Sequence, residues 1–222
     1  MTTSLPALSL LETRVLGVLV EKQHTVADTY PLTLNALVAG CNQKTSRDPV
    51  LSATDAEVQA TVDRLKSLSL IVESSGGRVM RYAHNVERVL ALPSQAVALL
   101  ASLMLRGPQT LGELRINTDR LHRFADISAV DAFLQELSSR PSGAMVAELP
   151  RAPGSRENRW MHLLSGAPPP DSAPSEHFAP PPGDFVALTE ITALKANVRH
   201  LEEELEALKT TVANLRRELG SS

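Results

Sequence analysis

Residues 54–84 constrain the fold of this chain more than any other stretch, because they join a marked helix start to a marked hairpin. Thr54 and Glu57 have the spacing of a capping box, in which each side chain satisfies a backbone N–H at the helix start. Apolar residues then recur on one helical face, at Val58, Val62 and Leu65. We therefore expect an amphipathic helix that packs along this face.

A hairpin is predicted directly after this helix. Residues 70–72 are β-formers, Gly76 and Gly77 supply the freedom that a tight reversal needs, and residues 78–84 alternate as a returning strand. A helix that feeds a hairpin is typical of the winged helix-turn-helix, in which a recognition helix and a wing approach nucleic acid together. We predict this fold for the first part of the chain.

Two earlier helices complete the first predicted domain, residues 1–92. Ser9 and Glu12 form another capping box, which starts the first helix. A second helix is expected to begin with Pro31 in its first turn, where a missing N–H costs nothing. The buried face of this second helix is predicted to consist of Leu34, Leu37, Val38 and Cys41.

The same order of elements repeats in residues 93–166, the second predicted domain. A first helix over residues 94–106 ends at Gly107 and Pro108, which together make a strong helix stop. The remaining expected elements are a helix capped by Thr110 and Glu113, a helix over residues 128–139, and strands over residues 144–147 and 159–164. The chain thus predicts two tandem winged helix-turn-helix domains, mainly α with small β-hairpins.

The sequence changes character after residue 166. Residues 167–185 are rich in proline and are predicted to form a linker. Residues 186–222 carry an unbroken heptad repeat, which favours a parallel two-stranded coiled-coil helix that pairs two chains. The alternative is one amphipathic helix folded back on its own domain. The predicted dimerisation positions are Ile191, Leu194, Val198, Leu201, Leu205, Leu208, Val212, Leu215 and Leu219.

Composition limits the classes of ligand. Aromatic residues make up only 3% of the chain, which disfavours single-stranded nucleic acid because few rings are present for base stacking. The net charge is −3, and residues 1–92 balance nine Lys and Arg against nine Asp and Glu, which counts against tight nonspecific DNA binding. The single cysteine, Cys41, is expected to be a buried structural thiol; the alternative is a reactive thiol.

No catalytic or metal-binding pattern is recognisable in the sequence. The six histidines show no close pairing, and none of the common zinc, hydrolase or phosphate-loop motifs occurs. We therefore expect a protein that is not an enzyme and has no cofactor. The N-terminus lacks the basic and apolar regions of a signal peptide, so we expect a cytoplasmic protein with no membrane span.

The polar segment over residues 42–50 and the two wings supply the candidate binding residues. Loops commonly carry function, and their cations suit phosphate contacts. In the alternative interpretation, Asn42, Gln43 and Arg47 only cap helix ends and pair with Asp48, and the wing arginines serve solubility or pair with Glu148 or Glu157. The candidate DNA-binding residues are Lys44, Thr45, Arg47, Arg64, Lys66, Arg78, Arg81, Arg151, Arg156 and Arg159.

Two functions remain open at this point. The leading hypothesis is a regulatory protein that binds duplex DNA as a homodimer and presents third helices and wings to two related half-sites. The alternative is a non-enzymatic scaffold for a protein partner, which the acidic residues Asp55, Glu57 and Asp131 near the starts of both third helices favour.

Several short segments resemble the YceH-like family of bacterial proteins. The most specific is the ten-residue word from Cys41 to Val50, and the resemblance extends over residues 8–166. The other matching words lie at residues 21–23, 30–32, 105–107, 112–115, 153–157 and 161–163. The resemblance implies tandem winged-helix domains, and it implies neither an enzymatic activity nor a cofactor.

Overall fold

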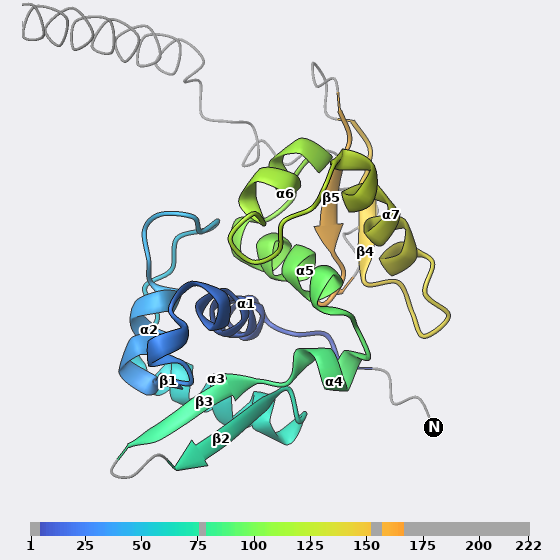
Figure 1. Ribbon diagram of the computed structural model, residues 1–222. Coiled ribbons are helices and arrows are strands. Elements are labelled where there is room, and N and C mark those ends of the chain that lie inside the picture. Colours follow the sequence, from blue (N-terminus) through green and yellow to red (C-terminus); the bar gives the residue numbers. More distant parts are fainter. Residues whose placement is uncertain (1–4, 76–78, 152–156, 167–222) are drawn as a thin grey trace, which may run out of the picture. The chain divides into compact units, whose positions relative to one another are not determined.

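The computed structural model describes residues 5–75, 79–151 and 157–166, which form a mainly α protein with two small antiparallel sheets (Figure 1). The elements of the first half are α1 (Leu10–Thr25), a short 3-10 turn (Ala27–Thr29), β1 (Leu32–Thr33), α2 (Leu34–Cys41), α3 (Asp55–Ser67), β2 (Ile71–Ser75) and β3 (Met80–His84). After α4 (Val86–Leu90), the second half contains α5 (Ser94–Arg106), α6 (Leu111–Asn117), α7 (Ile127–Ser138), β4 (Val146–Leu149) and β5 (Arg159–His162).

All three predicted capping boxes are confirmed. In each box a Ser or Thr hydroxyl accepts from the backbone N–H three residues on, and the glutamate at that position accepts from the N–H of the capping residue. These reciprocal bonds satisfy donors that a helix leaves unpaired at its start. The pairs are Ser9 with Glu12, Thr54 with Glu57, and Thr110 with Glu113. The sequence therefore places the starts of α1, α3 and α6 correctly.

The first sheet has the strand order β1-β3-β2. The hairpin of β2 and β3 is antiparallel, with Ile71 opposite His84, and β1 adds to its other edge, with Leu32 opposite Tyr82. A strand that lies between the first and second helices thus pairs with the last strand of the same half.

The second half repeats this order on a smaller scale. Strands β4 and β5 pair antiparallel, with Val146 opposite His162. Gln109, which lies between α5 and α6 as β1 lies between α1 and α2, forms a bridge to Trp160 on β5, with backbone hydrogen bonds of 2.7 and 3.0 Å in the two directions. The arrangement of helices and strands therefore occurs twice in the described residues.

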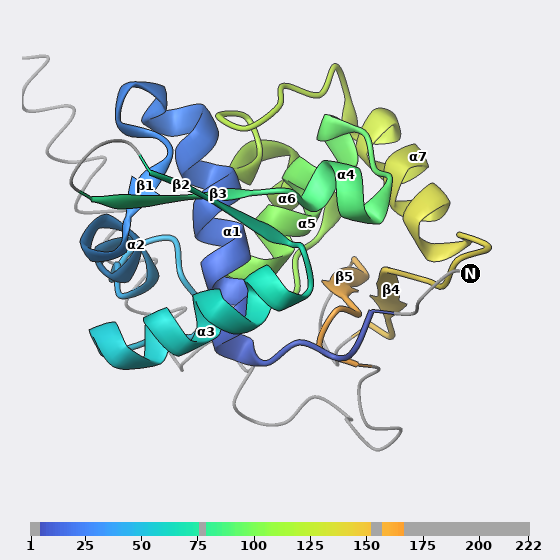
Figure 2. The ribbon, with the colours of Figure 1, turned by 90° about the horizontal axis from the view of Figure 1, so that it is seen from below.

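The two halves share one aliphatic core. Helices α1 and α5 lie side by side (Figures 1 and 2), and the other helices of each half pack around its own member of this pair. Gly17 lies at the contact, where an added Cβ would come within 2.9 Å of Leu105. Because buried side chains from both halves form one continuous cluster, burial of apolar surface stabilises the halves together.

Two local predictions were wrong, and one helix was missed. Pro31 does not begin a helix; it precedes β1, and Thr33 caps α2 instead. Strand β2 runs to Ser75, three residues beyond the predicted strand residues 70–72, because residues 73–75 pair with residues 80–82 of β3. Helix α4 was not predicted, because five residues are too few to show a helical period.

The predictions for the tail lie outside the described residues. These are the linker over residues 167–185 and the coiled coil over residues 186–222. The described residues all lie within one compact unit, and the boundary proposed between residues 92 and 93 stays a prediction. No helix among the described residues is long and apolar enough to cross a membrane.

Candidate nucleic-acid interface

The connector between α2 and α3, residues 42–54, is held in place by buried polar contacts (light blue in Figure 1). Arg47 is buried, and its guanidinium donates to both carboxylate oxygens of Glu21 on α1, at 3.1 and 2.6 Å. The Asn42 side chain donates to and accepts from the backbone of Ala53, at 2.8 Å each way. A paired charge and a double amide contact of this kind give the connector one defined conformation.

A second buried arginine, Arg14 of α1, also holds the connector in place through hydrogen bonds. Its side chain is fully buried and donates to the carbonyl oxygens of Cys41 at 3.2 Å and Pro49 at 2.7 Å. The far side of the connector contacts the end of α5, where Arg106 donates to the Ser46 hydroxyl at 2.8 Å and the Asp48 N–H donates to the Leu105 carbonyl at 2.8 Å. The connector is therefore fixed to both halves of the molecule.

Burial and neighbouring charge shape the ionisation of this cluster. Burial favours a raised pKa for Glu21, but the hydrogen bonds and charge of Arg47 outweigh it and hold that pKa below its usual value. Burial and the like charge of Arg47 lower the pKa of Arg14. Cys41 is buried, as predicted, and burial raises the pKa of its thiol to about 12.

The tip of the connector faces solvent. Lys44 is exposed, and no hydrogen bond or ion pair to another described residue engages its ammonium group. Thr45 is also exposed and accepts from the Gln43 side-chain amide at 3.2 Å. These two candidate residues are available to a ligand, whereas the side chain of Arg47 is buried and paired with Glu21.

The equivalent connector of the second half, residues 118–126 between α6 and α7, also carries exposed cations. Arg120 is exposed, and Arg123 is 88% exposed and lies 3.7 Å from Asp119 across a weak surface contact. Arg115 on α6 donates to the Ala125 carbonyl at 3.2 Å and so fastens this connector as well. Sequence reasoning missed these arginines. Their position just before a third helix, as in the first half, was the signal that could have found them.

Most of the predicted third-helix and wing cations have partners inside the protein. Arg64 on α3 pairs with Glu12 at 2.7 Å, and Lys66 pairs with Glu73. Arg81 on β3 donates to the Pro31 carbonyl at 2.8 Å, and Arg159 on β5 donates to Glu113 at 3.0 Å. Arg151 is exposed beside a shallow groove of about 380 Å³ that Ile127 and Trp160 also line. Arg78 and Arg156 lie outside the described residues.

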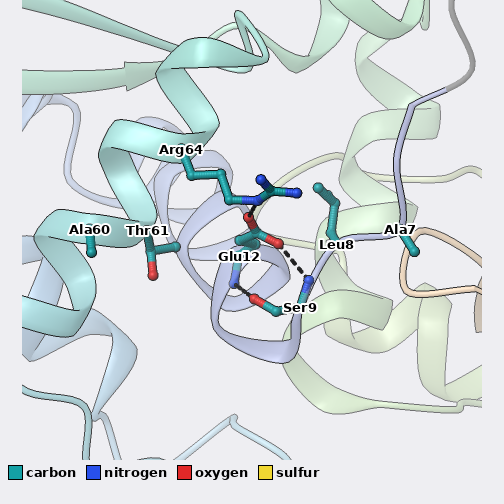
Figure 3. A pocket seen from close by; sticks show the side chains of 7 residues that line it. All are labelled: Ala7, Leu8, Ser9, Glu12, Ala60, Thr61 and Arg64. Carbon is teal, nitrogen blue, oxygen red and sulfur yellow. Dashed lines mark hydrogen bonds and ion pairs between the residues drawn. The ribbon is translucent and has the colours of Figure 1, made fainter.

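An open groove of about 510 Å³ lies between α3 and the segment that leads into α1 (Figure 3). Glu12 lies between its walls and is engaged on both sides, because it accepts from the Ser9 N–H at 2.6 Å and pairs with Arg64 at 2.7 Å. The carboxylate is therefore occupied in holding α1 to α3. The lining residues are Ala7, Leu8, Ser9, Glu12, Ala60, Thr61 and Arg64.

These features define a mainly helical protein with a repeated helix and hairpin arrangement and two anchored connectors that carry exposed cations. Within the described ranges, no three His, Cys, Asp or Glu side chains are grouped so that they could hold a metal ion. The arrangement of helices and strands thus defines the class of fold. Comparison with known proteins identifies the family.

The chain belongs to the DUF480 family, whose model is described as "Protein of unknown function, DUF480" and matches residues 8–155. It is 56% identical over 218 residues to a UPF0502 protein of Dechloromonas aromatica, covering 98% of this chain and 100% of the relative. It is 58% identical over 202 residues to the UPF0502 protein Mpe_A1449 of Methylibium petroleiphilum, covering 91% and 85% of the two chains. It is also 58% identical over 215 residues to the UPF0502 protein BTH_II0990 of Burkholderia thailandensis, covering 96% and 90%. The predicted resemblance to a family of uncharacterised bacterial proteins is confirmed.

Proposed function

We propose that this protein binds duplex DNA through two tandem winged helix-turn-helix modules. The observation that supports this most is the strand order β1-β3-β2, with β1 between the first two helices of its half and the hairpin after the third. That order of elements is the winged-helix order, and the bridge from Gln109 to Trp160 repeats it in the second half.

In this proposal α3 and α7 are the helices that approach the duplex, and the hairpins β2–β3 and β4–β5 are the wings beside them. Both third helices start with bonded caps, at Thr54 and Asp126. Capped helices and paired strands hold a binding surface in place before the ligand arrives, which reduces the entropy lost on binding.

The heptad repeat over residues 186–222 supplies the second part of the proposal. Its spacing favours a parallel pair of chains, so that a homodimer would present two copies of the same modules to two related half-sites. A dimer on paired half-sites is the common arrangement of regulatory proteins, and we propose a regulatory role on that basis.

Fluorescence anisotropy with the full-length protein and a labelled duplex of random genomic sequence tests this proposal. Measured over a salt series, the logarithm of the affinity should fall linearly with the logarithm of the salt concentration, by about 0.9 for each phosphate neutralised. Binding that does not respond to salt would contradict the proposal.

A second function, a scaffold for a protein partner, is favoured by a specific observation. The predicted cations of α3 and the strands are paired internally, and the start of α3 exposes Asp55 and Glu57. If this function is correct, the purified chain will leave duplex DNA unbound at low salt, and it will form a stoichiometric complex with a protein partner that nuclease treatment does not disrupt.

A further inference from the structure

The exposed cations of the two halves lie in equivalent places. Lys44 is in the connector before α3, and Arg120 and Arg123 are in the connector before α7. All three side chains are exposed, and among the described residues Arg123 contacts only Asp119, at 3.7 Å. These positions contrast with those of Arg64, Arg81 and Arg159, whose guanidinium groups are held by carboxylates or carbonyl oxygens of the protein.

The third helices themselves begin with negative charge. Asp55 and Glu57 stand in the first turn of α3, and Asp126 caps α7. These carboxylates bond to helix-start amides or complement the helix dipole. A phosphate approaching either helix start would therefore meet carboxylates on the helix and cations on the connector just before it.

We propose that the two connectors, and not the wings, make the principal phosphate contacts on duplex DNA. The inference rests on the proposed function. Lys44, Arg120 and Arg123 supply the charge, and the exposed Thr45 hydroxyl can donate a hydrogen bond to a phosphate oxygen.

The anchoring of the connectors explains why this placement suits phosphate binding. Arg47, Arg14 and Arg106 tie the first connector to α1 and α5, and Arg115 ties the second to α6. A cation on a fixed loop loses less conformational entropy when it binds than one on a mobile loop. In this account Arg47 is a positioning residue, which acts on DNA only through the connector that it holds.

Two full-length variants of equal charge change test the inference. The connector variant is Lys44→Gln, Arg120→Gln, Arg123→Gln, and the wing variant is Arg78→Gln, Arg151→Gln, Arg156→Gln. Thermal melting followed by circular dichroism checks that each variant keeps its fold. Each variant and the unsubstituted protein are titrated with the same duplex of random sequence over a salt series, and Arg88→Gln, an exposed cation on α4, serves as a further control.

The connector variant should lower the slope of log affinity against log salt by about 2 to 3, and should weaken binding about tenfold or more at 0.1 M salt. The wing variant should lose clearly less, and Arg88→Gln should match the unsubstituted protein. If the connector variant keeps the original slope, or the wing variant loses as much or more, the inference is overturned while the DNA-binding proposal stands. If the unsubstituted protein binds no duplex, both fall together.

Discussion

At the scale of single residues, some charged side chains hold the fold together and others are exposed to solvent. Arg47 was a candidate phosphate contact, yet its guanidinium is buried against Glu21, three residues from the exposed Lys44. The sequence indicated that the polar segment over residues 42–50 was a candidate binding site. It could not show which of its cations is buried. That choice depends on Glu21, which lies 26 residues away and reaches Arg47 only after α1 and α2 have packed.

Replacing Arg47 with Met should destabilise the fold by about 2–4 kcal/mol, because Glu21 would keep its partly buried charge without its partner. Urea unfolding followed by circular dichroism measures this change. Lys44→Met should change the stability by less than about 0.5 kcal/mol, because Lys44 is exposed. Equal stabilities for the two variants would show that the Arg47 contact is not structural.

Two histidines at matching positions should make stability depend on pH. His84 ends β3 and His162 ends β5, and burial lowers the pKa of each to about 4. For His84, the charge of nearby His24 adds to the effect. A histidine with a depressed pKa binds its proton more readily in the unfolded chain, so the folded state loses stability as the pH falls from about 6.5 to about 4.

Between pH 7 and pH 5 each of these histidines should lower the free energy of unfolding by about 1–2 kcal/mol. Unfolding in urea at the two pH values measures the loss. The double variant His84→Gln, His162→Gln should lose less stability over this interval than the unsubstituted protein, because glutamine does not titrate. An identical loss would mean that other groups carry the acid sensitivity.

At the scale of elements, local signals and long-range contacts account for different parts of the fold. Capping boxes and apolar spacing predicted α1, α3 and α6 correctly, because each of these signals involves only residues that are close together in the sequence. Strand β1 and the Gln109 bridge are too short to show a pattern, and each exists because a distant strand offers it hydrogen-bonding partners. The exposed arginines of the second connector were missed because local patterns do not show which side chains of a connector remain exposed.

Two helical glycines provide a matched test of helix packing. Gly40 on α2 faces α1 so closely that an added Cβ would lie 2.6 Å from the Val18 side chain. At Gly112 on α6, no atom of the described part of the chain would lie within 4 Å of an added Cβ. Alanine favours a helix over glycine by about 1 kcal/mol. We therefore expect Gly112→Ala to stabilise the protein by up to about 1 kcal/mol, and Gly40→Ala to destabilise it by about 1–3 kcal/mol.

Thermal or urea unfolding of the two glycine variants gives both values. A stabilising Gly40→Ala would mean that α1 and α2 can separate at little cost, and that the close contact at Gly40 does not determine their spacing.

At the scale of the whole molecule, two modules behave as one unit because α1 and α5 share a core. The order of elements predicted for the two copies agrees with the structure, and the boundary between residues 92 and 93 stays a prediction. Their union depends on close contacts such as Gly17 against Leu105, which no local pattern reveals. The proposed pairing of two chains rests on the heptad positions of residues 186–222 alone.

The coiled-coil proposal predicts a dimer that depends on the heptad leucines. Leu201→Glu together with Leu208→Glu should convert the dimer to a monomer, because two charges would be placed in the apolar seam. Sedimentation equilibrium of the full-length protein measures the mass. Glu203→Gln, outside the seam, should leave the dimer unchanged. A dimer that survives the leucine substitutions would place the chain contact elsewhere.

The most direct test of the DNA-binding proposal is the affinity of the full-length protein for a duplex of random sequence at 50 mM and at 200 mM salt. If the modules bind DNA through its phosphates, the affinity should fall about threefold to fourfold between these conditions for each phosphate neutralised. The absence of any binding at 50 mM salt would contradict the proposal.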